Sequence, residues 1–495
     1  MIWPVIAAVS LLYVFLATSG TFGELPAQTD YYDRMAEGFR AGQLHLREAP
    51  SPALLATDDP YADKYVQLGL WDASLYDGRY YFYWGPVPAL VVLAIEAVTG
   101  MPFVNDQWLG LLFMLGRFYG CAALILALCR LRALSPPTWL VALAIAVSGL
   151  AGPAPFIVAR PHVYEACLAA GQCFLVWGLW AAFHGLTSSQ ARNLWFLLAG
   201  GLWALALGSR VTTWVAVPPL VAITLAVSWS RGNGWAPALR RTATRVAREA
   251  CAFAVPLATA VLAYGAYNYV RFDSPTEFGV RYQITNQKFW THGSYVLPNL
   301  FAYLWAPLEW SCRFPFATSV PNRPHPWFLP WPPGYQIWER VSGVLVMAPW
   351  CYFFAITLLR LARSAWARMR TGASLNVERF DSLELWASYC ALALLPTVIP
   401  ALGLWEASMR YSGDALAGGV LGATLGAFWL VRRASDSGSR LLEFQATSLI
   451  VAAAAYTCVA GTFSALRSYD DPFEWYNPGL FHWLEATLSL CVSPE

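Results

Sequence analysis

Long runs of apolar residues recur along this chain of 495 residues, and they limit what it can fold into. Only 13% of the residues are charged, against roughly 25% in an ordinary soluble domain. A helix needs roughly twenty apolar residues to cross a bilayer. Runs of about that length lie near 2–20, 107–128, 138–157, 164–185, 194–209, 211–230, 250–270, 341–361, 383–404, 414–431 and 443–465. The sequence therefore predicts an all-α polytopic membrane protein with about eleven transmembrane helices.

Arginine collects in three short segments between these runs, and this pattern predicts the orientation. The segments are "ALRRTATRVARE" (238–249), "RLARSAWARMR" (360–370) and "VRRASDSGSR" (431–440). Because Lys and Arg favour cytoplasmic loops, all three are predicted to lie inside the cell. Alternation of the spans then places the N-terminus inside. It places the segments around 158–163, 210, 271–340 and 405–413, together with the C-terminus, outside. No Lys or Arg precedes the first apolar run, so we expect a retained span there rather than a signal peptide.

One further apolar segment, "YYFYWGPVPALVVLAIEAVTG" (80–100), looks like a twelfth span. A full crossing would place either the N-terminus outside or one of the Arg-rich segments outside. The preceding stretch, 21–80, is poor in bases, and its aromatic end suits a membrane interface. We therefore expect 80–100 to form a helix that lies in the outer leaflet, with a full crossing as the alternative.

Two long outer segments divide the chain. The first, 21–106, follows the first span and is predicted to contain juxtamembrane helices; it is called loop one below. The second, 271–340, is rich in Pro and Trp and is predicted to form an aromatic flap on the membrane surface, able to close over a ligand. The predicted division is a catalytic transmembrane module at 1–270, the flap at 271–340, and C-terminal helices with a short outer tail at 341–495.

Acidic and basic side chains gather at the predicted outer ends of the spans. Ionisable residues near a membrane are costly, so each one suggests a function. Arginine binds phosphate through two hydrogen bonds, and a carboxylate can take a proton. Together they predict a site for an anionic, partly lipidic ligand. The candidates are Asp30, His162, Glu165, Arg210, Arg281, Tyr282 and Arg410.

Several of these residues also have a structural interpretation. Asp30 could cap a surface helix that begins at Tyr31. Arg210 could only reach toward lipid headgroups. Arg410 and Asp414 lie four residues apart, which on a helix is the spacing of an ion pair.

Cysteine and charge exclude other classes of function. The ten cysteines include no CxxC pair, so no redox motif or zinc knuckle is present, and a disulfide between Cys312 and Cys491 is left open. His162 is more often hydrogen-bonded locally than a metal ligand, and Glu165 could simply pair with Arg160. A formal charge of +2 without a basic tract predicts no nucleic-acid partner.

Six stretches together resemble the GT-C superfamily of membrane glycosyltransferases. More narrowly, they are similar to the bacterial branch allied to protein O-mannosyltransferases and the lipid A aminoarabinose transferase. The stretches are "TDYYDRMAEGFRAGQLHL", "DASLYDGRYYFYWGPVPALV", "RPHVYEA", "LALGSRVTTW", "YNYVRFDSPTEFGVRYQ" and "MRYSGD". The resemblance implies a cavity roofed by loop one and open to the outer leaflet, and a polyprenyl-phosphate sugar as donor.

The resemblance also implies roles for single residues. The catalytic aspartate falls on Asp30 and a second acid on Glu165. The bases that hold the lipid phosphate fall on Arg210 and, less directly, on Arg281 and Arg410. Residues expected to contact the substrate are Tyr31, Trp84, His162, Tyr282 and Trp290, most of them by stacking on sugar rings.

The expected reaction is an inverting sugar transfer on the outer face of the bacterial cytoplasmic membrane, with Asp30 as general base. The acceptor, whether glycan, lipid or protein, is left open. No cofactor is expected, because the Asp-x-Glu metal motif of oligosaccharyltransferases is missing, although His45, His162 and several acids could still meet around a metal. The alternative from another class is a transporter or flippase for a lipid-linked or small anionic substrate, and a non-catalytic scaffold is a third.

Overall fold

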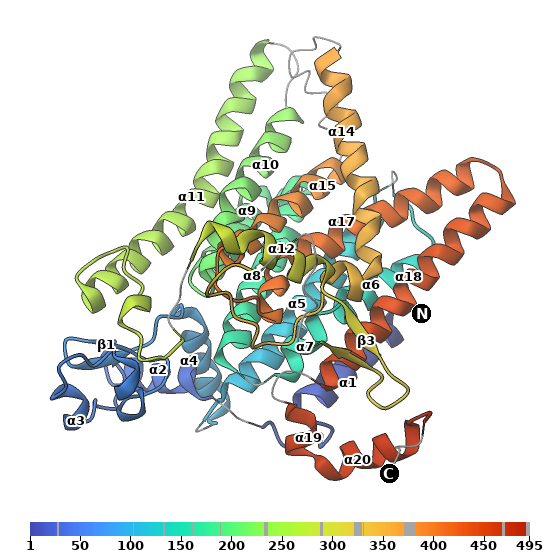
Figure 1. The fold of residues 1–495 in the computed structure, drawn as a ribbon. Helices are drawn as coiled ribbons and strands as arrows, with labels where there is room; N and C mark the ends of the chain where they lie inside the picture. Colours follow the sequence, from blue (N-terminus) through green and yellow to red (C-terminus); the bar gives the residue numbers. More distant parts are fainter. Residues whose placement is uncertain are drawn as a thin grey trace.

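The protein is a bundle of long helices with short elements packed against one end (Figure 1). The computed structural model describes the chain except residues 27–28, 102, 132–133, 161, 189, 232–235, 288–290, 321–328, 330, 371–382, 468–470 and 492–495. Its longer helices are α1 (Ile2–Ala17), α2 (Tyr31–Arg40), α4 (Val87–Thr99), α5 (Asp106–Cys129), α6 (Thr138–Leu150), α8 (Val163–Thr187), α9 (Arg192–Leu207), α10 (Val217–Ser230), α11 (Ala236–Phe272), α12 (Val296–Trp305), α14 (Phe354–Arg370), α15 (Leu383–Leu394), α17 (Met409–Asp436), α18 (Arg440–Leu466) and α20 (Pro478–Leu488). Shorter elements are α3 (Pro52–Leu55), η1 (Asp63–Leu68), β1 (Ser74–Tyr76), β2 (Arg79–Tyr81), α7 (Ala154–Ala159), η2 (Val211–Val215), η3 (Val280–Tyr282), η4 (Gly293–Tyr295), β3 (Leu308–Trp310), β4 (Ala317–Ser319), α13 (Val344–Met347), η5 (Pro349–Phe353), η7 (Leu395–Val398), α16 (Ile399–Leu402) and α19 (Pro472–Tyr476).

The helices confirm the predicted fold class. Within the described ranges, seven helices are long and apolar enough to cross a membrane, and four shorter apolar helices accompany them. Each apolar run predicted from the sequence falls on one or more of these elements. Some runs are broken: 138–157 divides into α6 and α7, and 341–361 divides into α13, η5 and α14. The chain is therefore an integral membrane protein whose helices are not all continuous rods.

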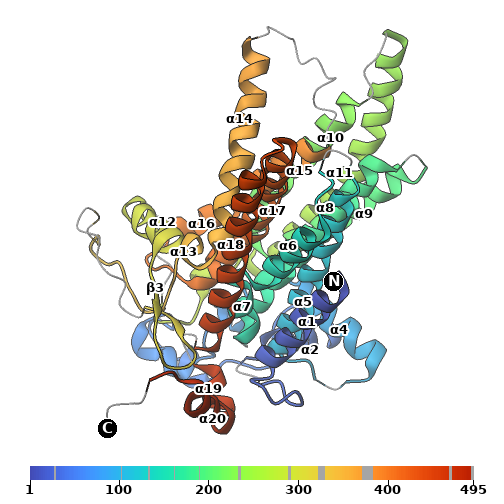
Figure 2. The same cartoon turned by 90° about the vertical axis from the view of Figure 1, so that its right-hand side faces the viewer.

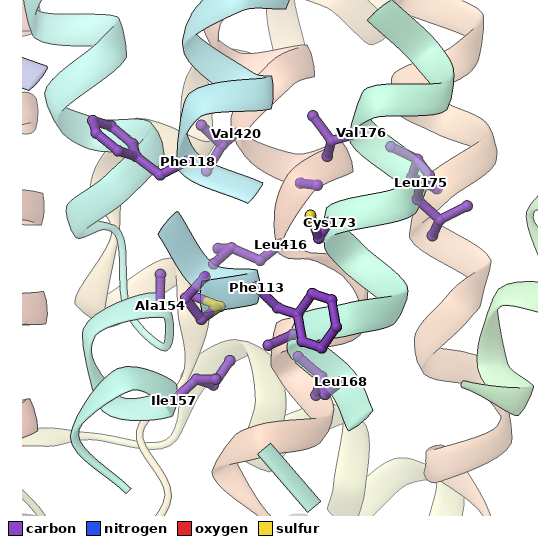
Figure 3. Packing of buried hydrophobic residues seen from close by; sticks show 14 of the residues in the cluster. Phe113, Phe118, Ala154, Ile157, Leu168, Cys173, Leu175, Val176, Leu416 and Val420 are labelled. Carbon is purple, nitrogen blue, oxygen red and sulfur yellow. The ribbon is translucent and has the colours of Figure 1, made fainter. Parts of the chain in front are cut away.

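Helices α5, α7, α8 and α17 form the centre of the bundle (Figure 3). Helix α8 is the most enclosed of the seven long apolar helices: 83% of its apolar 18-residue stretch is buried inside the protein. Small residues allow this packing because they let two helix backbones approach closely. At Gly418 of α17, for example, an added Cβ would lie only 2.6 Å from the backbone carbonyl oxygen of Ala391 on α15. Phe113 of α5 and Leu168 of α8 belong to the buried core between the central helices.

The two ends of the bundle differ in charge and in structure. The Arg-rich ends of α11, α14 and the α17–α18 turn point the same way (Figure 2). Loop one, the β3–β4 hairpin and helices α19 and α20 lie at the opposite end. The three segments predicted to be cytoplasmic are thus at one end, as the predicted orientation requires.

Loop one contains the predicted juxtamembrane helices and a hairpin that the prediction missed. The helix expected over 80–100 begins only at Val87, because Arg79–Tyr81 pair with Ser74–Tyr76 as strands. The signal was the Asp77–Gly78 step, where both residues have positive φ and make a tight hairpin turn. At 13 residues, α4 is roughly 20 Å long, shorter than a bilayer core of roughly 30 Å. Its length favours the predicted placement in one leaflet.

Loop one docks on the bundle at Gly85. The backbone N–H of Val87 donates to the carbonyl of Gly208, at the end of α9, over 3.1 Å. A Cβ added at Gly85 would lie 2.1 Å from that same carbonyl oxygen. Only glycine permits this approach between loop one and the turn that carries Arg210.

We expect Gly85→Ala to push loop one away from this turn. Overpacking of this kind costs about 1–3 kcal/mol, so the apparent melting temperature in detergent should fall. Gly201→Ala in α9 is the matched control, because an added Cβ there meets no atom within 4 Å in the described structure. Equal melting temperatures for the two variants would contradict the docking role of Gly85.

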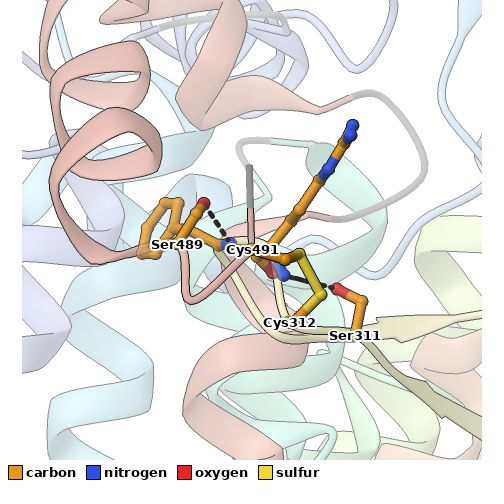
Figure 4. The surroundings of a disulfide bond; sticks show 6 residues. Ser311, Cys312, Ser489 and Cys491 are labelled. Carbon is orange, nitrogen blue, oxygen red and sulfur yellow. Dashed lines mark hydrogen bonds between the residues drawn. A yellow bond between two sulfur atoms is a disulfide. The ribbon is translucent and has the colours of Figure 1, made fainter. Parts of the chain in front are cut away.

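A disulfide joins the β3–β4 hairpin to the segment that follows α20 (Figure 4). Cys312, in the turn between β3 and β4, is bonded to Cys491, which follows α20. The backbone N–H of Leu490 also donates to the carbonyl of Cys312 over 2.7 Å. The pairing left open by the sequence is therefore present, and it fastens the chain end to the flap.

Candidate functional site

A cavity of about 340 Å³ lies where loop one, the flap and the bundle meet. Its wall combines aromatic, charged and small polar residues from segments far apart in the sequence. Loop one and the flap contribute Asp72, Tyr83, Trp84, Gly85, Phe278, Val280, Gln283, Gln287 and Glu339. The bundle contributes Tyr164, Cys167, Ser209, Arg210, Val211, Thr212, Tyr264, Pro400, Ala401, Leu404, Trp405, Glu406, Ser408, Arg410 and Tyr411.

Arg210 lies on one side of this cavity and is held by an acid from α17. Its Nη2 lies 2.9 Å from Oδ2 of Asp414, and its Nε donates to Oδ1 over 3.3 Å. The Thr212 hydroxyl donates to the same Oδ1 over 3.0 Å. Asp414 is therefore the ion-pair partner of Arg210. The alternative reading of Arg410 and Asp414 as a helical ion pair is corrected, because no such pair occurs among the described side chains.

Arg410 lies on α17, one turn from Asp414, and has different partners. Its Nη1 donates to Oε1 of Glu339 over 2.7 Å and lies 4.0 Å from Oε1 of Glu165. Arg160 lies between the same two acids, 3.7 Å from Glu165 and 3.6 Å from Glu339. Two arginines and two carboxylates thus form one buried group beside the cavity. Glu165, predicted as a catalytic acid, belongs to this group and is fully buried.

Glu339 completes the group from the flap. Its carboxylate also accepts a hydrogen bond from the Ser408 hydroxyl. Burial opposes its ionisation, but Arg410 and Arg160 hold the pKa of Glu339 below its ordinary value. It therefore faces the cavity as a carboxylate. Sequence reasoning did not single it out, although an acid among the aromatic residues of the flap was a signal.

Asp72 is a further buried carboxylate on the cavity wall, and burial raises its pKa instead of leaving it low. It lies in loop one just before β1, in the left-handed backbone region with φ of 59°. Its Oδ1 accepts a 2.6 Å hydrogen bond from Nε2 of Gln283. Burial raises the pKa of Asp72 to about 6, against the opposing effects of the Gln283 hydrogen bond and the Arg410 charge. A general base works best when its pKa lies near the working pH, so this carboxylate is suited to take a proton.

Asp30, the aspartate implied by the resemblance, does not line this cavity. It precedes α2 as expected, and its carboxylate is 2.8 Å from Nε of Arg34 and 34% exposed. It faces a second cavity, of about 310 Å³, lined by Asp30, Asp33, Arg34, Glu37, Leu46, Arg47, Glu48 and Phe103. Its role as a base stays a prediction.

The cap of α2 comes from another helix. Asp106, at the start of α5, accepts from the backbone N–H groups of Tyr31 and Tyr32 over 3.1 and 3.2 Å. It also accepts a 2.5 Å hydrogen bond from the Thr29 hydroxyl. In the described structure the Asp30 side chain makes no capping hydrogen bond. The segment around Asp30 is therefore fixed by Asp106.

Of the aromatic and basic candidates, too, some line the cavity that contains Arg210 and Arg410, and others do not. Trp84 lines the cavity of about 340 Å³ that contains Arg210 and Arg410, called the large cavity below. Tyr31 stacks on Phe82, with the two ring centroids 4.6 Å apart. Arg281 is 65% exposed and pairs with Glu277 over 2.8 Å. Neither Arg281 nor the adjacent Tyr282 is among the residues that line the cavity.

Two further candidates complete the set. His162 precedes α8, with its ring 6.2 Å from that of Tyr164, and it does not line the cavity. Trp290 lies outside the described residues. Across the described ranges, no three His, Cys, Asp or Glu side chains come together as a metal site would require. Whether the protein needs a metal stays a prediction.

No family model and no curated protein matches the chain. Among solved structures, it is similar to the oligosaccharyltransferase AglB from Archaeoglobus fulgidus in complex with an inhibitory peptide and a dolichol-phosphate, with a TM-score of 0.49 and 12% identity over 94% of this chain. The chain spans only 55% of the length of that protein. It is also similar to ArnT from Cupriavidus metallidurans bound to undecaprenyl phosphate, with a TM-score of 0.45 and 13% identity over 100% of this chain and 81% of ArnT. Both are GT-C glycosyltransferases, the superfamily that the sequence motifs resemble, and neither likeness assigns a role to a residue of this chain.

Proposed function

We propose that the protein transfers a sugar from a polyprenyl-phosphate donor to an acceptor hydroxyl in the large cavity. One observation carries the proposal. The same cavity is lined by Asp72, a buried carboxylate with a pKa of about 6, and by the guanidinium groups of Arg210 and Arg410. A base and a cationic phosphate site in one cavity are what a displacement at a sugar phosphate needs.

The reaction we propose inverts the sugar. Asp72 takes the proton of the acceptor hydroxyl while that oxygen bonds to the anomeric carbon, and the bond from this carbon to the phosphate oxygen breaks. Arg210 and Arg410 stabilise the negative charge that grows on the departing phosphate. We assign to Asp72 the role that the resemblance implies for Asp30. Glu339 and Glu406 line the same cavity, but Glu339 pairs with Arg410 and Glu406 accepts hydrogen bonds from two backbone N–H groups.

The rest of the wall suits the other parts of such a donor. Tyr83, Trp84 and Trp405 offer flat apolar faces on which a sugar ring can stack. Val211 and Pro400 give the cavity an apolar side, and Val211 is 57% exposed. We propose that the prenyl chain leaves the cavity past Val211 into the bilayer.

Glu339 competes with the donor phosphate in this proposal, because its carboxylate already contacts Arg410 and Arg160. We expect Glu339→Gln to raise the affinity for undecaprenyl phosphate about tenfold, equivalent to ~1.4 kcal/mol. The neutral amide keeps the shape and the Ser408 contact but removes the competing charge. Binding is measured with the purified protein in lipid nanodiscs.

Glu406→Gln is the matched control for this variant. Glu406 lines the same cavity, but its carboxylate accepts from the backbone N–H groups of Trp338 and Glu339. The affinity of the Glu406→Gln variant for undecaprenyl phosphate should stay near that of the wild-type protein. Unchanged or weaker binding by Glu339→Gln would show that the phosphate does not use Arg410.

We also propose that the cavity faces the outside of the cytoplasmic membrane. The Cys312–Cys491 disulfide joins the β3–β4 hairpin to the segment after α20. The hairpin and α20 lie at the end of the bundle opposite the Arg-rich segments (Figure 2), and disulfides persist in oxidising compartments. In intact spheroplasts, a membrane-impermeant maleimide should label these two cysteines only after mild reduction. The Cys312→Ser, Cys491→Ser double variant should lose this reduction-dependent label. A label that needs permeabilised membranes would reverse the orientation.

The function is tested by release of undecaprenyl phosphate. The purified protein is given a panel of undecaprenyl-phosphate-linked hexoses and pentoses with cell-envelope extract as the source of acceptor. Release from at least one donor, dependent on the extract and on Asp72, is the expected result. Movement of the intact lipid across a proteoliposome membrane without release would instead support the transporter or flippase.

A further inference from the structure

The flap is joined to loop one directly beside Asp72. The backbone N–H of Asp72 donates to the carbonyl of Ile284 over 3.0 Å, and the N–H of Ile284 donates to the carbonyl of Ala73 over 2.8 Å. Ser74 and Gln283 face each other in an antiparallel bridge. The residue of the flap that reaches the Asp72 side chain, Gln283, is therefore fixed to loop one through its backbone.

The side chain of Gln283 is oriented by Asp72. Its Nε2 donates to Oδ1 of Asp72 over 2.6 Å, and the whole residue is only 6% exposed. In the described part of the chain, its Oε1 is buried without a hydrogen-bond partner. An ionised carboxylate only accepts, so the amide nitrogen must face it. A glutamine kept only for packing would satisfy both ends of its amide, because a buried unpaired oxygen is costly.

Other groups also act on Asp72, and they remain when Gln283 is changed. The charge of Arg410 and a hydrogen bond from Trp71 favour its ionised form. The phenols of Tyr31 and Tyr83 face it from loop one, and their pKa values are raised by burial and by its charge. Gln283 is the contact from the flap, and the same stretch of flap lines the cavity through Phe278 and Val280.

We propose that Gln283 is a positioning residue, which orients the Asp72 carboxylate and keeps it ionised when the flap is paired with loop one. This inference rests on the proposed function and deepens it. Contacts of the donor with Phe278 or Val280 are thereby linked to the base through one hydrogen bond. The Asp72 carboxylate therefore has its Gln283 hydrogen bond only while the flap is paired with loop one.

The test is the pH dependence of kcat/KM for release of undecaprenyl phosphate by the full-length protein. Gln283→Leu removes the hydrogen bond that favours the carboxylate, so the acidic limb should move up by about one pH unit. Gln283→Lys supplies a donor with a positive charge, so the limb should move below its wild-type position. Both variants should change kcat much more than KM, because the donor phosphate and lipid contacts are untouched.

Gln287→Leu is the matched control, since Gln287 is another amide of the same flap segment and cavity wall. Its acidic limb should stay at the wild-type position. If Gln283→Leu does not fold, the opposite shift in Gln283→Lys still tests the inference. If the acidic limb of kcat/KM stays at its wild-type pH in both Gln283 variants, the positioning role is overturned and the proposed function still stands. A wild-type protein that releases no undecaprenyl phosphate would overturn both.

Discussion

Replacing Asp72 by asparagine is expected to lower kcat/KM for sugar transfer about 10²–10⁴-fold, the usual contribution of a general base. The amide keeps the size of the side chain but cannot take the proton of the acceptor. In the wild type, the rate should fall on acidification through about pH 6, because protonation of Asp72 removes the base. The residual activity of Asp72→Asn should lack this acidic limb. Both quantities come from release of undecaprenyl phosphate measured across pH.

Asp30→Asn is the comparison for this variant, because Asp30 belongs to the second cavity and pairs with Arg34. We expect it to keep most of the activity and the acidic limb. If Asp30→Asn abolishes transfer while Asp72→Asn does not, then the aspartate implied by the resemblance is the base. Asp72 would then have only a structural role.

Replacing Arg410 by glutamine is expected to have the second largest effect, a loss of about 10²–10³-fold in kcat, as for other groups that stabilise charge in a transition state. The variant also removes one of the two cations beside Glu339 and Glu165 and leaves only the more distant Arg160. Breaking a buried pair costs about 3–5 kcal/mol. Its melting temperature should fall together with its activity. Thermal unfolding and kcat are measured on the same preparation.

The Arg410→Gln, Glu339→Gln double variant separates the two effects. It replaces the 2.7 Å ion pair by two amides, so much of the lost thermal stability should return. The turnover should stay low, because the cation that faces the leaving phosphate is still missing. Recovery of turnover together with stability would show that Arg410 only holds the fold.

The fold followed from the sequence because a bilayer imposes one strong rule. Each crossing needs a long apolar run, and the runs in this chain coincide with helices in the structure. Two hairpins, β1–β2 and β3–β4, were not predicted. The first had a local signal at Asp77–Gly78. The prediction missed this signal because it took the aromatic run that follows, from residue 80, as the start of a helix.

The site was predicted less completely, because its acids depend on contacts over long distances in the chain. Asp72 is paired with Gln283, 211 residues away, and nothing near "WDAS" in the sequence shows that this acid turns inward. Glu339 reaches Arg410 only because the flap folds back onto α17. Arg210 and Arg410 were singled out because they lie at the predicted outer ends of spans, where ionisable residues gather and each one suggests a function.

The most direct test of the account is the structure of the wild-type protein bound to undecaprenyl phosphate in a nanodisc. We expect the phosphate inside the large cavity, within hydrogen-bond distance of Arg410 or Arg210, with Asp72 facing it and the prenyl chain passing Val211. A phosphate held in the cavity beside Asp30, or out of reach of both arginines, would contradict the proposed site.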